Sequence, residues 1–328
     1  MLKYNWHASY ILTTLMESQM TNALATKEDV SIRRLTPAMG AEVIGMDLSK
    51  PMNDSEVARL REELNKNGVL CFRDQDLTEA QQIEFSRRWG PLEDFPEENK
   101  TVAAPTVYSV ANVSAEGVHL PETDHRVIFQ KVNAFWHTDS SYRYVPAYAS
   151  LLYGIEVMPD DAVGGRTGFS NMVKAYEALT TEMKTLIEPL HMVHSYEHGR
   201  RLFRELPPLS KFEKDTVPPV SHPLVRVHPD ADNRRSLFIT ANAGNEISGL
   251  PLDEGQALHR ELIEHISRPE FCYFHKWCKG DLVVWDNRTT LHKAETYDMA
   301  RYRRVFRRTT VAGNGPVIGP FSQRMRTA

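Results

Sequence analysis

Phe135-Trp136-His137-Thr138-Asp139-Ser140-Ser141-Tyr142 is the stretch that decides the fold, because it carries the pattern His-x-Asp. Side chains two positions apart on an extended segment point to the same face, so His137 and Asp139 could bind one ion together. His292 lies far downstream, after the apolar run 282–285 that predicts a buried strand, and could supply a third ligand. Two imidazoles and one carboxylate leave open positions on a metal, which suits Fe(II) that must bind O2. The alternative interpretation is a histidine that lies beside a solvated aspartate by chance.

A basic segment follows the third proposed ligand. Within 303–311, the alternation of a strand places Arg304, Phe306 and Arg308 on one face. Two guanidinium groups on an inward face are costly unless they meet anions. A planar guanidinium can hold a carboxylate through two parallel hydrogen bonds, so the pattern predicts that Arg304 and Arg308 hold acidic groups near the metal. The alternative is an edge strand with a solvated basic face.

These residues together resemble a known family. From about residue 30 to residue 311, the chain is similar to the Fe(II)/2-oxoglutarate dioxygenases of the taurine dioxygenase and 2,4-dichlorophenoxyacetate dioxygenase family. Four motifs carry the resemblance in the order in which the family has them: His137-x-Asp139, Gly164-Gly165-Arg166-Thr167, Trp285-Asp286-Asn287-Arg288 with His292, and Arg304 followed by Arg308. The residues of the first and third motifs are more similar to the phenoxyacetate branch than to the taurine branch.

The resemblance implies a role for each motif at the metal and at 2-oxoglutarate. His137, Asp139 and His292 correspond to the iron ligands of the family. Thr167 and Arg304 match the pair that binds the distal carboxylate of 2-oxoglutarate. The implied cofactors are therefore Fe(II), 2-oxoglutarate and O2.

Two further positions match the substrate side of the family's site. Arg308 corresponds to the residue that holds the acidic group of the prime substrate, and Asn133 falls where the taurine branch places a substrate-side residue. One departure concerns 2-oxoglutarate: Arg304 lies one position farther from His292 than the family's spacing, and Arg303 would restore that spacing. Arg304 is preferred because it shares a strand face with Arg308.

The implied reaction is the oxidation of a C–H bond of a small acid, coupled to decarboxylation of 2-oxoglutarate to succinate and CO2. Related halogenating enzymes lack the carboxylate ligand, so the presence of Asp139 favours hydroxylation. The alternatives are desaturation, cyclisation or other oxidative tailoring of a metabolite with the same cofactors, and a sulfonate substrate. A non-catalytic cupin-like binding protein would lack one of the ligands.

A second group of histidines suggests a rival metal site. His191, His194 and His198 are spaced so that three imidazoles would share one face of a helix, as in a zinc site. Pro189 and the β-branched residue Val193 favour a strand or turn instead, on which the three would not converge. His194 is then interpreted as a core or pocket residue.

Composition is that of an ordinary enzyme. The chain has 328 residues, 41% of them hydrophobic, and a formal net charge of −4, so it has no global attraction to nucleic acid or anionic membranes. The pair Arg200-Arg201 is interpreted as a solvated patch or part of an interface. The three cysteines show no close pairing pattern and predict buried free thiols in a reducing compartment. We expect a cytoplasmic enzyme with a small acidic substrate, which forms a homodimer or homotetramer by analogy with the family.

The predicted organisation is one dioxygenase domain over 30–311 with an extension on each side. Residues 1–29 are expected to form a disordered extension, with a targeting segment or a start at Met16 or Met20 as alternatives. Residues 312–328, rich in glycine and proline, are expected to form a loose tail. The fold class is mainly β with helices (α+β), and the resemblance implies a double-stranded β-helix, which is a jelly-roll, cupin-like core with helical decoration.

Local signals predict the elements of this domain. Capping residues and apolar periodicity predict helices at 53–66, 78–89, 170–179 and 253–266. Strands are expected at 68–72 and 305–311, and a hairpin is expected in which 271–277 pairs with 282–285. The polar stretch 93–132 has few regular signals and predicts a long loop that acts as a lid or binding loop.

Overall fold

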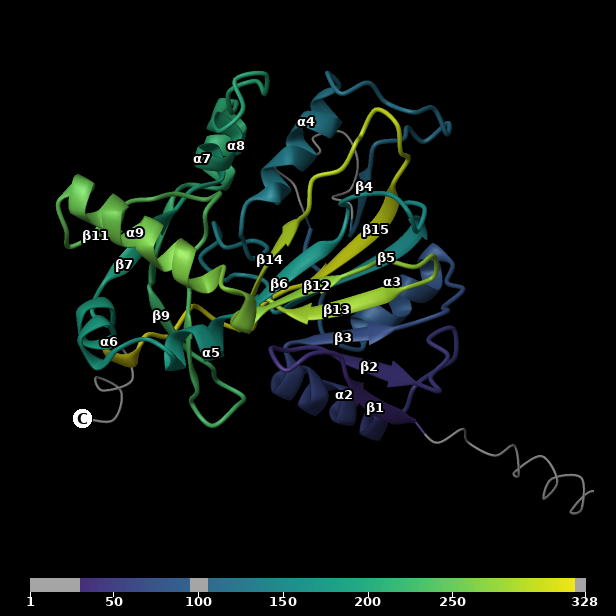
Figure 1. Cartoon of the computed structure of the whole chain (residues 1–328), viewed down its shortest axis with the longest axis horizontal. Coiled ribbons are helices and arrows are strands. Elements are labelled where there is room, and N and C mark those ends of the chain that lie inside the picture. Colours follow the sequence, from purple (N-terminus) through teal and green to yellow (C-terminus); the bar gives the residue numbers. More distant parts are fainter. Residues whose placement is uncertain (1–29, 95–105, 322–328) are drawn as a thin grey trace, which may run out of the picture.

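The computed structural model describes residues 30–94 and 106–321, in which a large sheet is covered by helices on one face (Figure 1). The seven strands of this main sheet lie in the order β1 (Ser31–Arg34), β2 (Ala41–Ile44), β3 (Val69–Phe72), β13 (Leu282–Asp286), β5 (Ala149–Glu156), β15 (Val305–Val311) and β4 (Val107–Ala111). A second sheet has the order β12 (Cys272–His275), β6 (Thr167–Asn171) and β14 (Thr290–Ala294). In both sheets the strand pairs are antiparallel except for β2 with β3.

The two sheets enclose one apolar core, and helices cover the outer face of the main sheet. Alternation along β13 sends Val283 and Trp285 into a cluster with Phe169 of β6. Leu282 and Val284 point the other way and pack with residues of α2 (Asp54–Asn67) and α3 (Glu79–Arg87). The continuous apolar run of β13 is thus explained, because both of its faces are buried.

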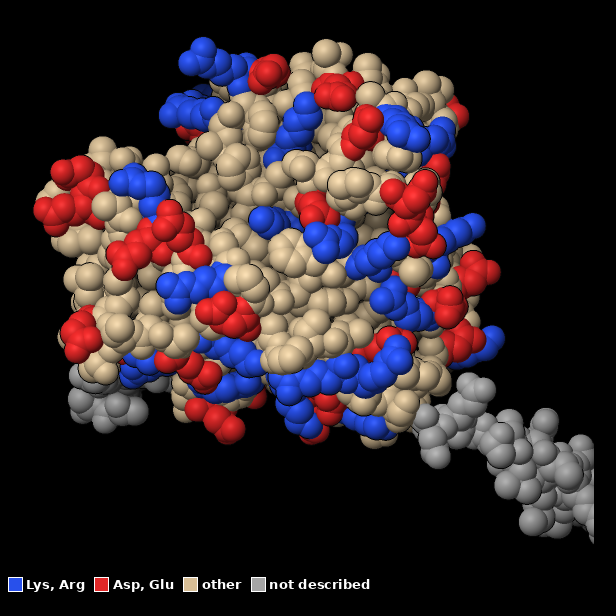
Figure 2. Space-filling view, in the orientation of Figure 1, with Lys and Arg blue, Asp and Glu red and all other residues tan. Residues whose placement is uncertain are grey.

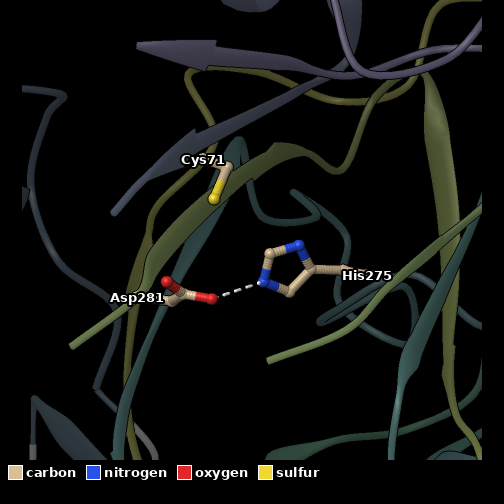
Figure 3. A group of neighbouring side chains, drawn as sticks. All are labelled: Cys71, His275 and Asp281. Atoms are coloured by element: carbon tan, nitrogen blue, oxygen red, sulfur yellow. Dashed lines mark hydrogen bonds and ion pairs between the residues drawn. The ribbon is translucent and has the colours of Figure 1, made fainter. Parts of the chain in front are cut away.

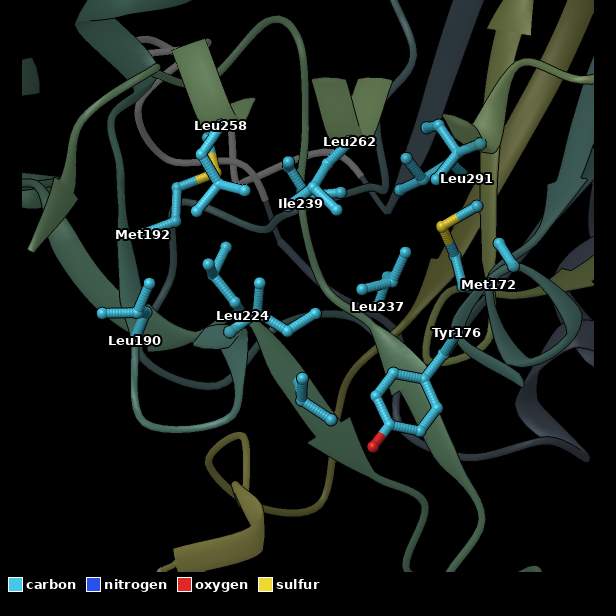
Figure 4. Close-up of a cluster of buried hydrophobic side chains, with 14 of the residues drawn as sticks. Met172, Tyr176, Leu190, Met192, Leu224, Leu237, Ile239, Leu258, Leu262 and Leu291 are labelled. Atoms are coloured by element: carbon cyan, nitrogen blue, oxygen red, sulfur yellow. The ribbon is translucent and has the colours of Figure 1, made fainter. Parts of the chain in front are cut away.

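A third apolar cluster lies in a smaller lobe beside the sheets (Figure 4). The lobe contains the strand trio β11 (Ile247–Ser248), β7 (His191–His194) and β8 (Val220–Pro223), the pair β10 (Arg235–Leu237) and β9 (Val225–Val227), and the helices α5 (Met172–Glu177), α6 (Thr181–Ile187) and α9 (Leu252–Ile266). Trp136 and Leu291 are buried in this cluster. These residues immediately precede His137 and His292, so the lobe fixes the backbone of both histidines.

Several local predictions are confirmed. The side chain of Asn53 caps α2, and Gly68 ends that helix at φ 73°. Thr78 caps α3 through a capping box. β3, α9 and β15 also occupy the predicted positions. These elements have strong local signals, because their caps and apolar periodicity are encoded within a few residues.

The predicted hairpin of 271–277 with 282–285 is wrong. β12 pairs with β6 in the second sheet, whereas β13 pairs with β3 and β5 in the main sheet. Gly280, at φ 85°, donates its N–H to the carbonyl of Gly154 and accepts from the N–H of Gln75. The connection is therefore anchored to the main sheet, and the chain crosses between the two sheets.

The region 93–132 is not one long loop. It contains β4, which pairs with β15 at the edge of the main sheet, and α4 (His125–Lys131), which is capped by Asp124 and followed by the 3₁₀ turn η1 (Val132–Ala134). The part of the predicted loop at 95–105 lies outside the described residues. The predicted helix at 170–179 is shorter, because β6 extends to Asn171, whose side chain caps α5.

The remaining elements are short. They are α7 (Tyr196–Arg201), α8 (Lys211–Thr216) and the 3₁₀ turn η2 (Pro269–Phe271). Residues 312–321, expected to be loose, run along β9, where the N–H of Val227 donates to the carbonyl of Ile318 at 2.8 Å. The expectations for 1–29 and 322–328 lie outside the described residues. Figure 2 shows acidic and basic side chains interspersed over most of one face, and no helix of the described part is long and apolar enough to cross a membrane.

Candidate active site

The structure brings His137, Asp139 and His292 together. His137 and His292 form an isolated antiparallel bridge, in which each backbone N–H donates to the other's carbonyl, at 2.9 and 2.7 Å. One possible ligand atom from each of the three side chains lies within 4.8 Å of the other two, and all three residues are buried. The sequence predicted an extended segment that includes both His137 and Asp139. In the structure only His137 pairs as in a strand, because a turn begins at Asp139.

The protonation state of the two imidazoles suits metal binding. Nδ1 of His137 lies 2.8 Å from the carbonyl of Phe135. A carbonyl can only accept, so Nδ1 carries the proton and Nε2 keeps its lone pair. Burial lowers the pKa of His137, and it lowers the pKa of His292 well below its usual value. Both rings are therefore neutral at physiological pH, which is the form that binds metals.

The third member of the group is an ionised carboxylate. Burial alone would raise the pKa of Asp139, but the charge of Arg308 and the hydrogen bond from Ser150 oppose it, and the pKa is lowered to about 2. Nη1 of Arg308 donates to Oδ1 at 2.8 Å, and Ser150 Oγ donates to Oδ2 at 2.7 Å. Two neutral nitrogens and one carboxylate oxygen form a donor set that fits a first-row divalent metal such as Fe(II).

Residues behind the carboxylate fix its position. Asn287 donates to Ser150 Oγ at 2.9 Å, and the hydroxyl of Thr138 donates to the Asn287 carbonyl at 2.8 Å. Trp285 Nε1 donates to Asn287 Oδ1 at 3.0 Å. The sequence indicated the motif 285–288 but not this role of Asn287, and nothing in the sequence singled out Ser150.

The turn after Asp139 is also held from outside. Ser140 adopts φ 56°, which is the left-handed region, and its hydroxyl donates to Glu93 Oε2. Burial raises the pKa of Glu93 to about 7, although the hydrogen bond from Ser140 opposes this shift. Sequence reasoning placed Glu93 at the start of a loop and missed this contact, because it depends on packing between distant segments.

A cavity with about 400 Å³ of empty space adjoins the two histidines. Its lining includes Thr167, Arg304 and Arg308, together with Asn133. The Arg304 side chain is buried and lies over the ring of Phe306, with its guanidinium carbon 4.0 Å from the ring centroid. Burial lowers the pKa of Arg304 to about 10, so the group is still charged at neutral pH.

Arg303 points away from this cavity. Its Nε donates to Glu156 Oε1 at 2.8 Å, and its Nη1 donates to the carbonyl of Gly117 at 2.8 Å. The Arg303 side chain is 40% exposed. The geometry therefore places Arg304, and not Arg303, beside Thr167.

A second, larger cavity with about 660 Å³ of empty space adjoins His137 and Asp139. His137, Asn133 and Arg308 line both cavities. Aromatic residues of several elements form much of the wall of the larger cavity: Tyr108, Phe129, Tyr142 and Tyr196. Arg200, on α7, also lines it. The structure thus brings all seven sequence-predicted site residues to two adjoining cavities.

The rival histidine group does not converge. His191 is exposed, whereas His194 is fully buried with its ring centroid 5.2 Å from that of Phe238. His198 lies on α7. Among the described residues, these three histidines form no cluster that could hold a metal, so His194 is the core residue that the sequence suggested.

A second buried cluster, Cys71 with His275 and Asp281, was not found from the sequence (Figure 3). His275 Nε2 lies 3.0 Å from Asp281 Oδ2, and Nδ1 lies 2.7 Å from the hydroxyl of Tyr273. Because an ionised carboxylate only accepts, Nε2 donates and Nδ1 accepts from Tyr273. Arg73 donates to the same Asp281 oxygen at 2.5 Å, and burial raises the pKa of the Cys71 thiol to about 12. Both ring nitrogens of His275 and the carboxylate of Asp281 are thus used in hydrogen bonds within the protein, so this cluster fits a structural role.

Comparisons with known proteins agree with this geometry. Residues 31–310 match the family model for "Taurine catabolism dioxygenase TauD, TfdA family". The chain is 36% identical to the alpha-ketoglutarate-dependent 2,4-dichlorophenoxyacetate dioxygenase of Cupriavidus pinatubonensis, over 84% of this chain and 96% of that protein. It is 31% identical to the alpha-ketoglutarate-dependent sulfate ester dioxygenase of Pseudomonas putida, over 94% and 99% of the two chains. The crystal structure of AAD-2 in complex with Mn(II) and N-oxalylglycine matches with a TM-score of 0.81 and 37% identity, over 88% of this chain and 99% of that chain.

Proposed function

Because the chain belongs to the TauD, TfdA family and is an alpha-ketoglutarate-dependent dioxygenase, we propose that it oxidises a C–H bond of a small carboxylate-bearing substrate. The proposed product is the hydroxylated acid, formed together with succinate and CO2. In this proposal His137, Asp139 and His292 hold Fe(II). When bound, the iron and 2-oxoglutarate together supply the activation of O2.

Thr167 and Arg304 are proposed to bind the distal carboxylate of 2-oxoglutarate. Support comes from their position in the smaller cavity, which His292 also lines. The buried guanidinium of Arg304 has no carboxylate of the described residues within ion-pair distance and lies over an aromatic ring. A buried cation of this kind favours an anionic ligand, because its desolvation is otherwise uncompensated.

Arg308 and Asn133 are proposed to position the prime substrate. The observation that carries the proposal is that the two cavities meet at His137, Asn133 and Arg308. One cavity can therefore take 2-oxoglutarate while the other presents a substrate to the same metal. The residues of this chain then act by placement: Arg308 orients an acid, and the cavity wall holds the rest of the molecule next to the metal.

The aromatic wall of the larger cavity favours an aryl or alkyl carboxylate over a small sulfonate, because rings bury apolar surface well. A sulfonate or sulfate ester remains the second candidate, since Arg308 can bind any of these anions. Desaturation or cyclisation would use the same residues. We also propose a cytoplasmic location and, by analogy with the family, a homodimeric or homotetrameric state.

The test is succinate release from purified protein with Fe(II), ascorbate and 2-oxoglutarate, with and without a panel of aryl carboxylates, alkyl carboxylates and sulfonates. We expect slow uncoupled succinate formation without a prime substrate and faster formation with an aryl carboxylate, accompanied by a product that is heavier by one oxygen atom. If iron-loaded protein forms no succinate at all, the proposal is wrong. If only sulfonates accelerate the reaction, the second candidate replaces the first.

A further inference from the structure

The two arginines of the pair Arg200-Arg201 have different surroundings. Arg201 is 74% exposed and forms an ion pair with Glu197 at 2.9 Å, as a solvated patch would. Arg200 instead lines the larger cavity, together with His137 and Arg308. The sequence interpretation of the pair as a solvated patch or part of an interface did not include this position of Arg200 in a cavity wall.

The guanidinium of Arg200 keeps hydrogen-bond donors available. Nη2 donates to the carbonyl of Pro207 at 3.0 Å, whereas Nε is buried and has no hydrogen-bond partner among the described residues. No carboxylate of the described residues forms an ion pair with Arg200, and the nearby Glu197 pairs with Arg201 and Lys214. A guanidinium with unused donors and no ion pair favours an anionic ligand, and Arg200 lines a cavity that can hold one.

Aromatic rings occupy the wall that carries Arg200. Its guanidinium carbon lies 6.0 Å from the ring centroid of Phe129 on α4. The rings of Tyr142 and Tyr196 are 4.8 Å apart, and Phe129 and Tyr196 are 6.4 Å apart. These rings offer apolar surface to a flat, aromatic ligand body.

Arg308 is the cation on the metal side of the same cavity. It donates to the proposed ligand Asp139 at 2.8 Å and lies over the ring of Tyr108 at 5.0 Å. Arg308 comes from β15 in the main sheet, whereas Arg200 comes from the short helix α7. The cavity is therefore lined by two cations from separate elements and by several aromatic rings.

We propose that Arg200 is a second anion anchor, and that the prime substrate is an arene that carries two acidic groups on opposite sides of the ring. This inference rests on the proposed function. Arg308 holds the acid near the metal, the rings enclose the arene, and Arg200 holds the distal acid. Because Arg308 touches Asp139, the carbon that is oxidised lies next to the acid held by Arg308.

The test compares two probes of nearly the same shape. 4-Carboxyphenoxyacetate has a distal carboxylate, whereas 4-carbamoylphenoxyacetate has a neutral amide in its place. For each probe, kcat and KM are measured by coupled succinate release, and Kd is measured without O2 on protein loaded with Mn(II) and 2-oxoglutarate. We expect the diacid to be preferred by about 10- to 100-fold, mainly through KM and Kd, since hydrogen bonds to charged groups are the stronger ones.

Matched variants test whether Arg200 causes the preference for the diacid. Arg200→Gln is expected to abolish it and Arg200→Lys to restore part of it, whereas the neighbouring Arg201→Gln keeps the preference of the wild type. A thermal midpoint equal to that of the wild type establishes that Arg200→Gln is folded. If Arg200→Gln is not folded, the role of Arg200 is judged from the preference of the wild type and of Arg200→Lys. The inference is overturned if the wild type binds both probes equally, binds neither, or if Arg200→Gln keeps the preference.

The same assays separate this inference from the proposed function. Uncoupled succinate formation by the wild type without any probe tests the proposed function alone. If succinate forms but the diacid is not preferred, only the role of Arg200 is wrong. If no succinate forms, the proposed function fails, and the Kd values still decide whether Arg200 binds a distal acid.

Discussion

Exchange of Arg304 or Arg303 for glutamine distinguishes two neighbouring candidates for the 2-oxoglutarate carboxylate. Arg304 is 5% exposed and lines the cavity with Thr167. Loss of one partner of a buried, hydrogen-bonded charge pair costs about 2–5 kcal/mol, which corresponds to a Kd weakened by roughly 30- to 5,000-fold. We expect this loss of 2-oxoglutarate affinity for Arg304→Gln.

Arg303→Gln is the matched control. Its ion pair with Glu156 is exposed, with side chains 40% and 41% accessible, and such pairs contribute about 0–1 kcal/mol to stability. The Kd for 2-oxoglutarate should therefore change less than about threefold. Calorimetric titration of Mn(II)-loaded protein measures both values, and thermal midpoints report whether each variant is folded. A large loss in Arg303→Gln with none in Arg304→Gln would refute the reasoning and favour the shorter spacing from His292.

Three further outcomes follow from the contacts described above. Arg308→Ala should lower coupled product formation by more than about 10-fold, because a charged hydrogen bond to the substrate is lost. The affinity for 2-oxoglutarate, measured by the same titration, should change far less. Equal losses of product formation and of 2-oxoglutarate affinity would contradict this role. In native protein, iodoacetamide should modify the exposed Cys278 quickly, whereas Cys71, buried and with its pKa raised to about 12, should react only after unfolding; peptide mass mapping checks this. Burial opposes ionisation of Asp286, but Arg288 outweighs it and lowers the pKa of Asp286 below its ordinary value of 3.8, so its stabilising contribution is present above about pH 4 and is lost as the pH falls below that value. Asp286→Asn should therefore lower the urea midpoint of unfolding at pH 7, and the midpoint of the variant should fall less than that of the wild type as the pH is lowered below about 4. The same pH dependence in both proteins would contradict this role of Asp286.

Much of the proposed site could be predicted because its residues occur in short sequence motifs. The alternation that puts Arg304 with Arg308 depends only on backbone periodicity, and the short motif His137-x-Asp139 marks two of the proposed ligands although a turn begins at Asp139. The structure places these residues, with Thr167 and His292, around two adjoining cavities. The capped helices α2 and α3 were predictable for a similar reason, since each cap lies within a few residues of its helix.

Features that depend on non-local packing were not predictable. The hairpin prediction failed because the apolar runs of β12 and β13 do not specify which partner strand each one takes. Arg200 belongs to the cavity only because the short helix α7 packs near α4. The cluster of Cys71 with His275 and Asp281 joins segments about 200 positions apart, and no local motif marks such a contact.

We propose that His137, Asp139 and His292 form the metal centre of this dioxygenase. The most direct test of this proposal is the stoichiometry of Mn(II) binding, measured by equilibrium dialysis in the presence of 2-oxoglutarate, for the wild type, Asp139→Asn and Cys71→Ser. We predict one ion per chain for the wild type and for Cys71→Ser, and loss of tight binding for Asp139→Asn while its thermal midpoint shows that it is folded. Undiminished binding by Asp139→Asn, together with loss of the ion in Cys71→Ser, would contradict the account and place the metal at the other buried cluster.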